Sequence, residues 1–315
     1  MTRLMLASVL AAAALVSQGG ALAAPVTAKV APEVVSSDAF PKLKASFPGG
    51  VSGLADVVYS VRTGYRPMTL DLYVPTKAGP AKPLVIYIHG GGWMNGTSRN
   101  AAAYADFPAV MAGLAARGYV VASLNYRLGR EAAFPAQNED VDTAIRWLKS
   151  HAADYGIDKS RVAVWGGSAG GHLAALAGAD CSPGDGKTES DCVQAAAIWY
   201  GLFDFNTLAN FPDFLGCSAV PDCTAIKAKA SPVTYVDKSD PPFLLLHGTA
   251  DGTAPIAQSR EMNERLKAAG VKVELIELPG IDHSWIGKTP AETTAAHLKA
   301  LQATFDFFDA TVGKR

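Results

Sequence analysis

Short apolar runs alternate with amphipathic stretches along most of the chain. Hydrophobic residues at consecutive positions are typical of strands that are buried on both faces of a parallel sheet. Such strands are predicted at 83–88, 119–124, 161–165, 195–200, 243–247 and 273–278. Between them, apolar residues recur about every three to four positions, which predicts helices at 105–117, 139–155, 172–178, 257–269 and 293–308. This alternation predicts an α/β fold with a doubly wound, mainly parallel sheet.

The segments 55–59 and 68–74 show a different pattern. In the second of them, polar Thr69 and Asp71 alternate with apolar neighbours, which predicts a strand with one polar side. We therefore expect both segments to form antiparallel strands at one edge of the sheet. No internal repeat and no second domain is indicated, so residues 54–315 are predicted to form one domain.

The first residues of the chain form a unit of their own. Arg3 precedes an apolar run at 4–16, and small residues follow up to Ala23 and Ala24. A positive start, an apolar run too short to span a bilayer and a small-x-small site predict a signal peptide over residues 1–23, with cleavage after Ala23 or Ala24. We therefore expect a secreted or periplasmic protein. A membrane anchor that stays on the mature protein is the alternative.

Composition narrows the class of protein. The chain has 315 residues, of which 49% are hydrophobic, and a net charge of −1, so it can build one large domain and carries no charge excess. We expect no nucleic-acid partner and, once the signal peptide is removed, no membrane partner. Residues 24–53 are rich in Pro, Ala and Ser without a clean period, and we expect them to form an N-terminal arm over the domain. Nothing in the sequence indicates an oligomeric state.

Four cysteines lie within one stretch of the chain, at Cys181, Cys192, Cys217 and Cys223. In an exported protein an even number of cysteines predicts disulfides, and four cysteines allow three pairings. The pairs Cys181–Cys192 and Cys217–Cys223 are favoured because each closes a local loop. A zinc site is the alternative, but the spacing is not C-x-x-C and no histidine cluster lies nearby. We therefore expect neither a metal nor a cofactor.

The segment 162–171 is the most informative in the chain and reads Val-Ala-Val-Trp-Gly-Gly-Ser-Ala-Gly-Gly. A buried strand runs directly into a G-x-S-x-G turn around Ser168, and a helix-forming stretch follows. The nucleophile elbow of an α/β-hydrolase requires this order of elements. Gly166 and Gly170 leave room around a sharp turn, and the helix N-terminus directs N–H groups at the point where negative charge develops. Ser168 is therefore predicted to be a nucleophile.

A serine hydroxyl is a weak nucleophile until a base accepts its proton. In this fold the acid and then the histidine follow the nucleophile along the chain. Asp251 and His283 each follow a predicted strand, so both are expected at the sheet edge from which Ser168 projects. We predict that His283 acts as general base and acid and that Asp251 orients its imidazole. Asp282 and Asp204 are the alternatives for the acid.

The other histidines fit the role of general base less well. His151 and His297 are expected on helices, and His172 is too near the nucleophile along a helix to meet it face on. His89 and His247 end strands beside glycines. In such positions a histidine more often braces a loop than exchanges a proton.

A second motif, His-Gly-Gly-Gly-Trp at 89–93, directly follows the predicted strand 83–88. Consecutive glycines allow the backbone to approach a substrate and to direct N–H groups at it. The motif matches the HGGG-type oxyanion loop, which acts together with the N–H of the residue after the nucleophile. We therefore predict that Gly91, Gly92 and Ala169 donate hydrogen bonds to an oxyanion.

Several separated motifs occur together in a fixed order. They are HGGGW at 89–93, Asn-Tyr-Arg-Leu at 125–128, Gly-Gly-Ser-Ala-Gly-Gly-His at 166–172, Ala-Ser-Pro-Val at 230–233 and Pro-Pro-Phe-Leu-Leu-Leu-His-Gly-Thr-Ala-Asp at 241–251. With these motifs, residues 57–308 resemble the α/β-hydrolases related to hormone-sensitive lipase, especially the branch that includes bifunctional feruloyl and acetylxylan esterases. The resemblance implies a serine esterase that acts through an acyl-enzyme. Its expected substrate is a small-molecule or polysaccharide-linked ester with a short-chain or aromatic acyl group.

Two features depart from the pattern of that family. The elbow reads Gly-Gly-Ser where the lipase-like branch usually has Gly-Asp-Ser. The cysteine-bearing segment 181–223 is not part of the pattern and occupies the region expected to shape the acyl pocket. Together with the irregular, aromatic-rich stretch after it, this segment predicts a short disulfide-braced cap around 181–242. Trp93, Phe203 and Trp285 are expected to bind substrate.

Other functions stay open on the sequence alone. An amide or peptide hydrolase of the same fold, such as an arylformamidase or a prolyl-oligopeptidase relative, has the same triad, and the formamidases also carry an HGG-type loop. A hydrolase-like binding protein without turnover has usually lost a triad residue, whereas all three are present here. A long-chain lipase needs a large apolar lid, which the polar, cysteine-bearing segment does not predict.

Overall fold

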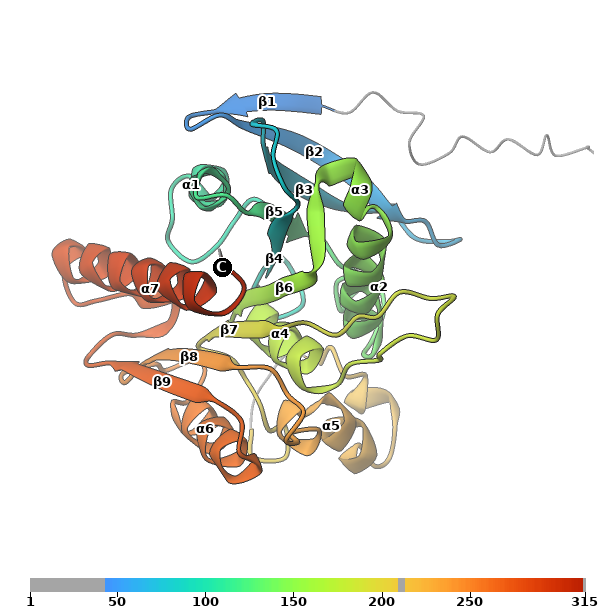
Figure 1. Ribbon diagram of the computed structural model, residues 1–315. Helices are drawn as coiled ribbons and strands as arrows, with labels where there is room; N and C mark the ends of the chain where they lie inside the picture. The colour runs from blue at the N-terminus through green and yellow to red at the C-terminus, as the bar shows by residue number, and fades with distance from the viewer. Residues whose placement is uncertain (1–42, 209–212, 314–315) are drawn as a thin grey trace, which may run out of the picture. The chain divides into compact units, whose positions relative to one another are not determined.

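The computed structural model describes residues 43–208 and 213–313, and its nine described strands form one sheet (Figure 1). The strands are β1 (Leu43–Phe47), β2 (Val51–Ser60), β3 (Met68–Pro75), β4 (Lys82–Ile88), β5 (Val120–Leu124), β6 (Ile157–Gly167), β7 (Ala195–Trp199), β8 (Phe243–Gly248) and β9 (Val273–Leu278). Their order in the sheet is β1-β2-β3-β5-β4-β6-β7-β8-β9. The pairings from β1 to β5 are antiparallel and those from β5 to β9 are parallel. The predicted mainly parallel sheet with antiparallel strands at one edge is confirmed.

Helices cover both faces of the sheet. They are α1 (Phe107–Ala116), α2 (Ala136–Ser150), α3 (Ala152–Tyr155), α4 (Ala169–Ala179), α5 (Thr224–Ala230), α6 (Ala257–Ala269) and α7 (Pro290–Thr311), with single 3-10 turns at Cys217–Ala219, Pro232–Thr234 and His283–Trp285. α1 and α7 pack on one face, and α2, α4 and α6 pack on the other (Figure 1). Among the described helices, none combines the length and the apolar character that crossing a membrane requires.

The central strand β4 shows how the sequence separates the two faces. Leu84, Ile86 and Ile88 pack into the core beneath α2 and α4, whereas Val85 and Tyr87 pack into the core beneath α1 and α7. All five side chains are buried, because a central parallel strand is covered on both faces. Burial of each aliphatic side chain contributes about 1.5–3 kcal/mol. The two cores hold the carboxyl ends of the parallel strands side by side, and these ends form the edge that carries the site.

The prediction of an N-terminal arm over residues 24–53 is wrong for residues 43–53. Residues 43–53 lie in the sheet, where β1 pairs antiparallel with the beginning of β2. Gly49 and Gly50 form the turn between the two strands, with φ of 78° and 70°, a region that glycine enters without steric cost. β1 is an edge strand with mostly exposed side chains, so its sequence carries no alternation of buried and polar positions. The predicted signal peptide and the rest of the arm lie outside the described residues.

The cap expected around 181–242 consists of two separate segments. β7 runs through the middle of this range as a central strand of the sheet. Because β7 is parallel to β6, both strands run from the same edge of the sheet. The loop 181–194, which leads into β7, therefore lies at the amino ends of the strands. Ser168 lies at the opposite edge, after the end of β6. Within the described part of 181–242, the chain that borders the active-site edge is the connection between β7 and β8. It is described at 200–208 and 213–242, and we call these residues the cap segment.

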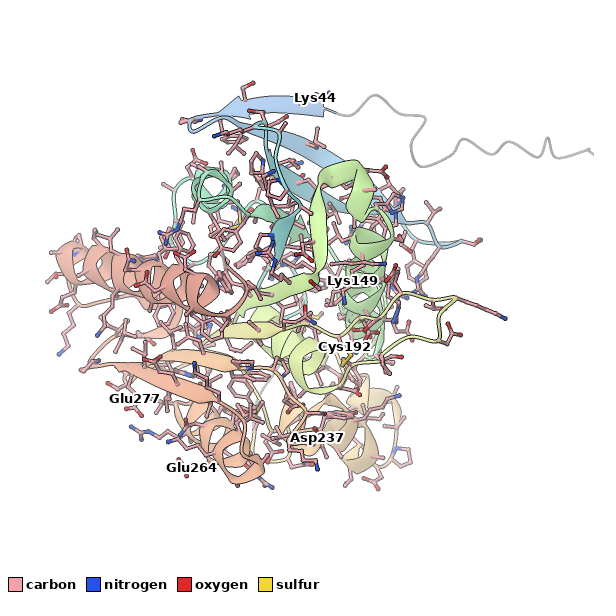
Figure 2. The ribbon with its side chains drawn as sticks, in the orientation of Figure 1. Lys44, Lys149, Cys192, Asp237, Glu264 and Glu277 are labelled. Atoms are coloured by element: carbon pink, nitrogen blue, oxygen red, sulfur yellow. A yellow bond between two sulfur atoms is a disulfide. The ribbon has the colours of Figure 1, made fainter. Side chains whose placement is uncertain are left out.

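Both favoured disulfides are present in the structure. Cys181 is bonded to Cys192, and Cys217 is bonded to Cys223. The first bond closes the loop after α4, where Lys149 Nζ donates a hydrogen bond to the carbonyl oxygen of Cys192 at 2.6 Å (Figure 2). The second bond lies in the cap segment just before α5. The two disulfides therefore brace opposite edges of the sheet, and one of them braces the cap as predicted.

Candidate active site

Ser168 lies at the sharp turn between β6 and α4. Its backbone has φ of 57° and ψ of −123°, a conformation that non-glycine residues rarely adopt. A Cβ at Gly166 would lie 2.2 Å from the carbonyl oxygen of Gly170, and a Cβ at Gly170 would lie 2.0 Å from that of Ile88. The N–H of Ser168 donates to the carbonyl oxygen of Trp199 at 3.0 Å and ties the turn to β7. Close packing of the backbone therefore holds the serine at the carboxyl end of the sheet.

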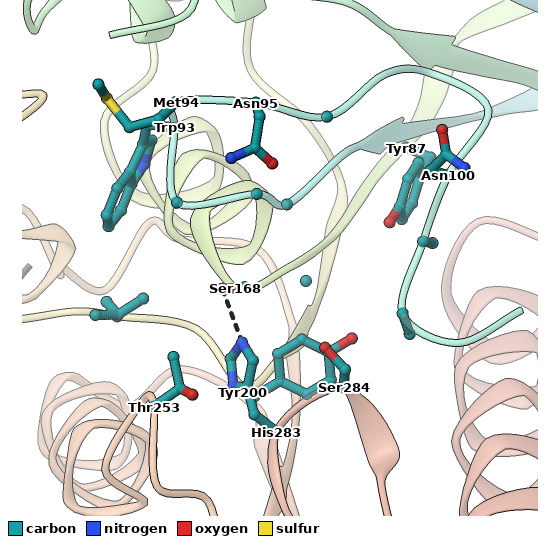
Figure 3. Close-up of a pocket in the computed structure, with 18 residues that line it drawn as sticks. Tyr87, Trp93, Met94, Asn95, Asn100, Ser168, Tyr200, Thr253, His283 and Ser284 are labelled. Carbon is teal, nitrogen blue, oxygen red and sulfur yellow. Dashed lines mark hydrogen bonds between the residues drawn. The ribbon is translucent and has the colours of Figure 1, made fainter. Parts of the chain in front are cut away.

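His283 faces Ser168 from the 3-10 turn that follows β9. Its Nε2 lies 3.0 Å from Ser168 Oγ, as the dashed line in Figure 3 shows. Its Nδ1 lies 2.7 Å from Oδ2 of Asp251, which belongs to the turn after β8. Both distances are those of hydrogen bonds, and the arrangement is that of a Ser-His-Asp triad. The structure thus brings together the three residues that the sequence predicts as the triad.

The carboxylate of Asp251 is buried and ionised. Its Oδ1 accepts hydrogen bonds from the N–H groups of Thr253, at 2.9 Å, and Ala254, at 2.7 Å. Burial raises the pKa of Asp251, but hydrogen bonds from His247 and His283 outweigh that effect and hold the pKa well below its usual range. A carboxylate that stays ionised stabilises the imidazolium that forms when His283 takes a proton from serine.

The two alternative acids occupy other positions. Asp282 Oδ1 accepts hydrogen bonds from the N–H groups of Gly252, at 2.9 Å, and His283, at 2.6 Å. Asp282 therefore joins the two turns that carry the acid and the base, through their backbones. Asp204 accepts a hydrogen bond from the N–H of Asn206 at 2.9 Å, inside the cap segment. The imidazole of His283 pairs with neither of them.

The glycine loop after β4 has no room for side chains. Gly91 and Gly92 have φ of 109° and 60°. A Cβ at Gly91 would lie 2.1 Å from the carbonyl oxygen of Asn95, and a Cβ at Gly90 would lie 2.8 Å from that of Gly167. A side chain at Gly90 or Gly91 would move the backbone, because the nearest atoms belong to the backbone.

N–H groups from two elements lie next to the nucleophile. Gly91 and Gly92 line the same cavity as Ser168. Ala169 is the first residue of α4, and the leading N–H groups of a helix have no partner within that helix. Glycine loops and helix N-termini supply such groups to a developing oxyanion. The three donor assignments stay predictions, to be tested with substrate.

A cavity of about 580 Å³ opens over Ser168 and His283. Figure 3 shows Trp93 and Met94 on one side of Ser168, with Tyr87 and Asn100 on the other. The first side presents apolar and aromatic groups, and the second presents hydroxyl and amide groups. The volume lies within the range of small-molecule sites in proteins.

Trp93 connects the glycine loop to the cap segment. It is one of the residues that line the cavity, but only 2% of its surface is exposed, and its ring stacks on Phe214 at a centroid distance of 3.9 Å. Its Nε1–H donates to Nδ1 of His172 at 3.1 Å, and His172 Nε2 contacts the carbonyl oxygen of Ala230 at 2.7 Å. Burial lowers the pKa of His172 to about 4, so above that pH the ring is neutral and accepts the indole N–H.

Trp285 does not line the cavity, which corrects its predicted role in binding. The side chain is fully buried and packs edge-on against Trp199 and Tyr200. Ser284 has φ of 58° and turns the chain sharply after His283, so that Ser284 lines the cavity while Trp285 enters the core. Neighbours in sequence therefore point in opposite directions at this turn.

Phe203 is the second correction among the predicted substrate-binding residues. Its ring is fully buried in the core, and its N–H donates to Gln258 Oε1 at 2.7 Å. Tyr200 and Leu202 line the cavity in its place, although neither is among the predicted binding residues. The signal for both residues is their position directly after β7, because ligand sites in parallel sheets are formed by the loops that follow the carboxyl ends of the strands.

The described residues hold one close group of potential metal ligands, Cys181, Asp191 and Cys192. Two of its members are bonded to each other in the disulfide that lies at the opposite edge of the sheet from Ser168.

A serine on a strand–helix turn, a His–Asp pair after the last two strands and a glycine loop beside the serine define a serine hydrolase of the α/β-hydrolase fold. The chain matches the BD-FAE family model over residues 70–266 and belongs to that family. The predicted membership among esterase-type α/β-hydrolases is confirmed.

Named relatives agree with this assignment. Esterase LipQ of Mycobacterium tuberculosis is 33% identical over 278 residues, which cover 83% of this chain and 63% of LipQ. Esterase LipC of the same organism is 37% identical, with coverage of 67% of this chain and 54% of LipC. The chain thus spans between about half and two thirds of these relatives. A solved structure, a truncated carbohydrate esterase from gut microbiota, has a TM-score of 0.67 and 28% identity, and covers 83% of this chain and 96% of its own.

Proposed function

We propose that the protein is a secreted serine esterase that hydrolyses short-chain or aromatic carboxylic esters through an acyl-enzyme. The observation that carries the proposal is the hydrogen-bonded path from Ser168 Oγ to His283, at 3.0 Å, and from His283 to Asp251, at 2.7 Å. Relatives that are named esterases support the reaction type.

The reaction follows from the geometry. His283 Nε2 accepts the proton of Ser168 as Oγ attacks the ester carbonyl, and the carbonyl oxygen becomes an anion next to the glycine loop. His283 then gives this proton to the leaving alkoxide, which departs as an alcohol and leaves the acyl group on Ser168. Water attacks the acyl-enzyme, with its proton taken by His283, and the acid leaves as Ser168 recovers its proton. Asp251 stays ionised throughout and stabilises each imidazolium.

The two sides of the cavity support a choice of substrate. Trp93, Met94 and Leu202 line the apolar side, and the stack on Phe214 fixes the Trp93 ring behind it, so this side suits a planar or short acyl group. On the other side, the Tyr87 hydroxyl and the Asn100 amide offer hydrogen bonds to an alcohol that carries further hydroxyl groups. We infer acetyl or feruloyl esters, with a carbohydrate as the alcohol. The similarity to a carbohydrate esterase structure supports this inference.

Export completes the proposal. Four cysteines in two disulfides suit an oxidising compartment. The predicted signal peptide at 1–23 supports the same location. N-terminal sequencing of the protein recovered outside the cytoplasm of the expressing cell tests the proposed export. We expect a mature chain that begins after Ala23 or Ala24.

The activity is tested with two esters and one variant. Initial rates of the oxidised protein on p-nitrophenyl acetate and methyl ferulate are compared with those of Ser168→Ala. We expect the variant to lose at least about 10⁴-fold on both esters, because the nucleophile is absent. The ratio of the two rates then assigns the acyl group. Equal rates of wild type and variant on both esters would overturn the proposal.

A further inference from the structure

His247 is a buried histidine that contacts the acid of the triad. It lies near the end of β8 and has no exposed surface. Its Nδ1 lies 2.7 Å from Ser259 Oγ on α6. Its Nε2 lies 2.8 Å from the carbonyl oxygen of Ala254 and 3.3 Å from Oδ2 of Asp251. Both partners of Nε2 accept hydrogen bonds and cannot donate them, so Nε2 carries a proton.

The same carboxylate oxygen therefore lies close to ring nitrogens of two imidazoles, and the Nε2–H of His247 is shared between Oδ2 and the nearer carbonyl oxygen of Ala254. Oδ2 of Asp251 accepts from His283 Nδ1 at 2.7 Å and faces His247 Nε2 at 3.3 Å. Oδ1 accepts from the N–H groups of Thr253 and Ala254. Backbone donors thus hold one oxygen of the carboxylate. Apart from the catalytic base itself, His247 is the described side chain that holds the other.

We propose that His247 is a positioning residue of the triad, whose Nε2–H holds Oδ2 of Asp251 where it accepts the N–H of His283. Ser259 contributes by fixing the ring, since its hydroxyl donates to Nδ1 and leaves the proton on Nε2. The inference rests on the proposed esterase activity, because its effect is expressed through the His283–Asp251 pair.

The position of Oδ2 matters because a carboxylate rotates about its Cβ–Cγ bond. Without the His247 contact, Asp251 keeps its backbone donors at Oδ1 and is free to tilt Oδ2 away from His283. The imidazole then loses part of its orientation and part of the stabilisation of its charged form. Both losses act in the transition state, when His283 carries the serine proton, so kcat is affected more than KM.

Two substitutions separate a positioning role from simple packing. His247→Met fills similar space without a donor, whereas His247→Gln places an amide N–H near the position of Nε2. We expect His247→Met to lower kcat on p-nitrophenyl acetate about tenfold, the effect of one hydrogen bond to a charged group. KM should change less than about twofold, because substrate does not touch His247. His247→Gln should recover most of kcat.

A double-mutant cycle with Asp251→Asn tests the route of the effect. If His247 acts through Asp251, His247→Met costs about tenfold in the wild-type background and less than about twofold in the Asp251→Asn background. An equal loss of kcat in both backgrounds would assign His247 to packing and overturn the inference. The comparison uses the complete chain and an activated ester, so that the slow double variant is measurable.

His297 provides a matched control. It is 7% exposed, lies on α7, and its Nδ1 contacts the carbonyl oxygen of Thr293 at 2.7 Å. We expect His297→Met to lower the thermal unfolding temperature as a buried substitution does, with kcat unchanged. A loss of kcat equal to that of His247→Met would show that any buried histidine gives the effect, and would count against the proposal.

A milder variant keeps the inference testable if His247→Met does not fold. Ser259→Ala removes the hydroxyl that fixes the ring and leaves the contact between His247 and Asp251 in place. We expect a loss of about two- to fivefold in kcat, a fraction of one hydrogen bond, which disappears in the Asp251→Asn background. A wild type without ester hydrolysis would refute the proposed function. An active wild type together with fully active His247 and Ser259 variants would refute only the role of His247.

Discussion

The catalytic edge and the cap segment border the same cavity, but they are held in place by different interactions. At the catalytic edge the backbone is packed against itself, and a Cβ at Gly166, Gly170 or Gly91 would lie 2.2 Å or less from a carbonyl oxygen. In the cap segment, side-chain contacts such as the stack of Phe214 on Trp93 add to a backbone hydrogen bond from the N–H of Phe134 to the carbonyl oxygen of Phe214 at 2.7 Å. We therefore expect the catalytic edge to tolerate fewer substitutions than the cap segment. If the proposed esterase activity holds, the residues of the reaction and part of the cavity wall lie in regions with different freedom to vary.

The largest expected effect comes from a side chain in the glycine loop. Gly91→Ala places a Cβ 2.1 Å from the carbonyl oxygen of Asn95 at a φ of 109°, so the loop must shift. We expect kcat to fall about 10²–10³-fold, as for loss of one oxyanion donor. Gly113→Ala is the control, because it lies within α1 with no atom within 4 Å of its Cβ position. That substitution should leave kcat unchanged and raise the free energy of unfolding by about 0.5–1 kcal/mol. Unchanged kcat in Gly91→Ala would show that the catalytic edge is not set by backbone packing.

The second largest effect is expected at Trp93, which connects the catalytic edge to the cap segment. Trp93→Phe keeps an aromatic ring for the stack on Phe214 but removes the N–H that His172 accepts at 3.1 Å. The buried Nδ1 of His172 then has no donor, which costs about 1–3 kcal/mol of unfolding free energy. Because the triad is untouched, kcat should fall less than about tenfold. Chemical denaturation and initial rates measure the two quantities, and full stability of the variant would contradict the importance of this hydrogen bond.

The two disulfides offer a direct comparison between the edges of the sheet. Cys217→Ser with Cys223→Ser opens a loop in the cap segment, and Cys181→Ser with Cys192→Ser opens a loop at the opposite edge. Each double variant should lose roughly 2 kcal/mol of unfolding free energy, as expected for short closed loops. KM should change only in the first, since Cys217 follows Phe214 closely along the chain. Equal KM values in both double variants would show that the cap segment does not need its disulfide to shape the cavity.

The smallest effect concerns a carboxylate far from the cavity. Burial, together with repulsion from Asp191, raises the pKa of Asp142 on α2 to about 7. The folded state then binds more protons than the unfolded state between about pH 4 and pH 7, so this group lowers stability as the pH rises through that window. The difference of about three pKa units corresponds to at most about 4 kcal/mol, and partial exposure of the side chain reduces this value, so Asp142→Asn should stabilise the protein by about 1–2 kcal/mol at pH 8 and by little at pH 4. Denaturation curves at the two pH values test the sign, and kcat should not change.

The catalytic edge could be predicted from sequence because its requirements are local. A strand, a turn that needs glycine and a helix are visible in one short segment around Ser168, and the order of acid and base follows from the fold. Packing in the cap and around the cavity was not predictable in this way. Trp285 was misplaced because the left-handed backbone of Ser284 reverses the direction of the next side chain. Phe203 was misplaced because the tertiary contact with Gln258, far away in sequence, decides which face of the chain is buried.

The edge strand β1 shows a different limit of sequence reasoning. It has a neighbour on one side only, and most of its side chains are exposed. Hydrophobic alternation arises where one face is buried, so a strand with little burial leaves little pattern. The turn glycines Gly49 and Gly50 were the remaining signal for this hairpin.

Both ends of the cap segment are fastened to the parts of the molecule around the triad. On the entry side, Gln258 of α6 accepts hydrogen bonds from the N–H groups of Phe203 and Asp204, at 2.7 and 2.9 Å. On the exit side, Ser231 Oγ accepts the N–H of Phe205 at 2.9 Å and so closes the base of the segment. Because Phe214 lies between these anchors and stacks on Trp93, we expect an insertion or deletion there to change the cavity wall before it disturbs the triad.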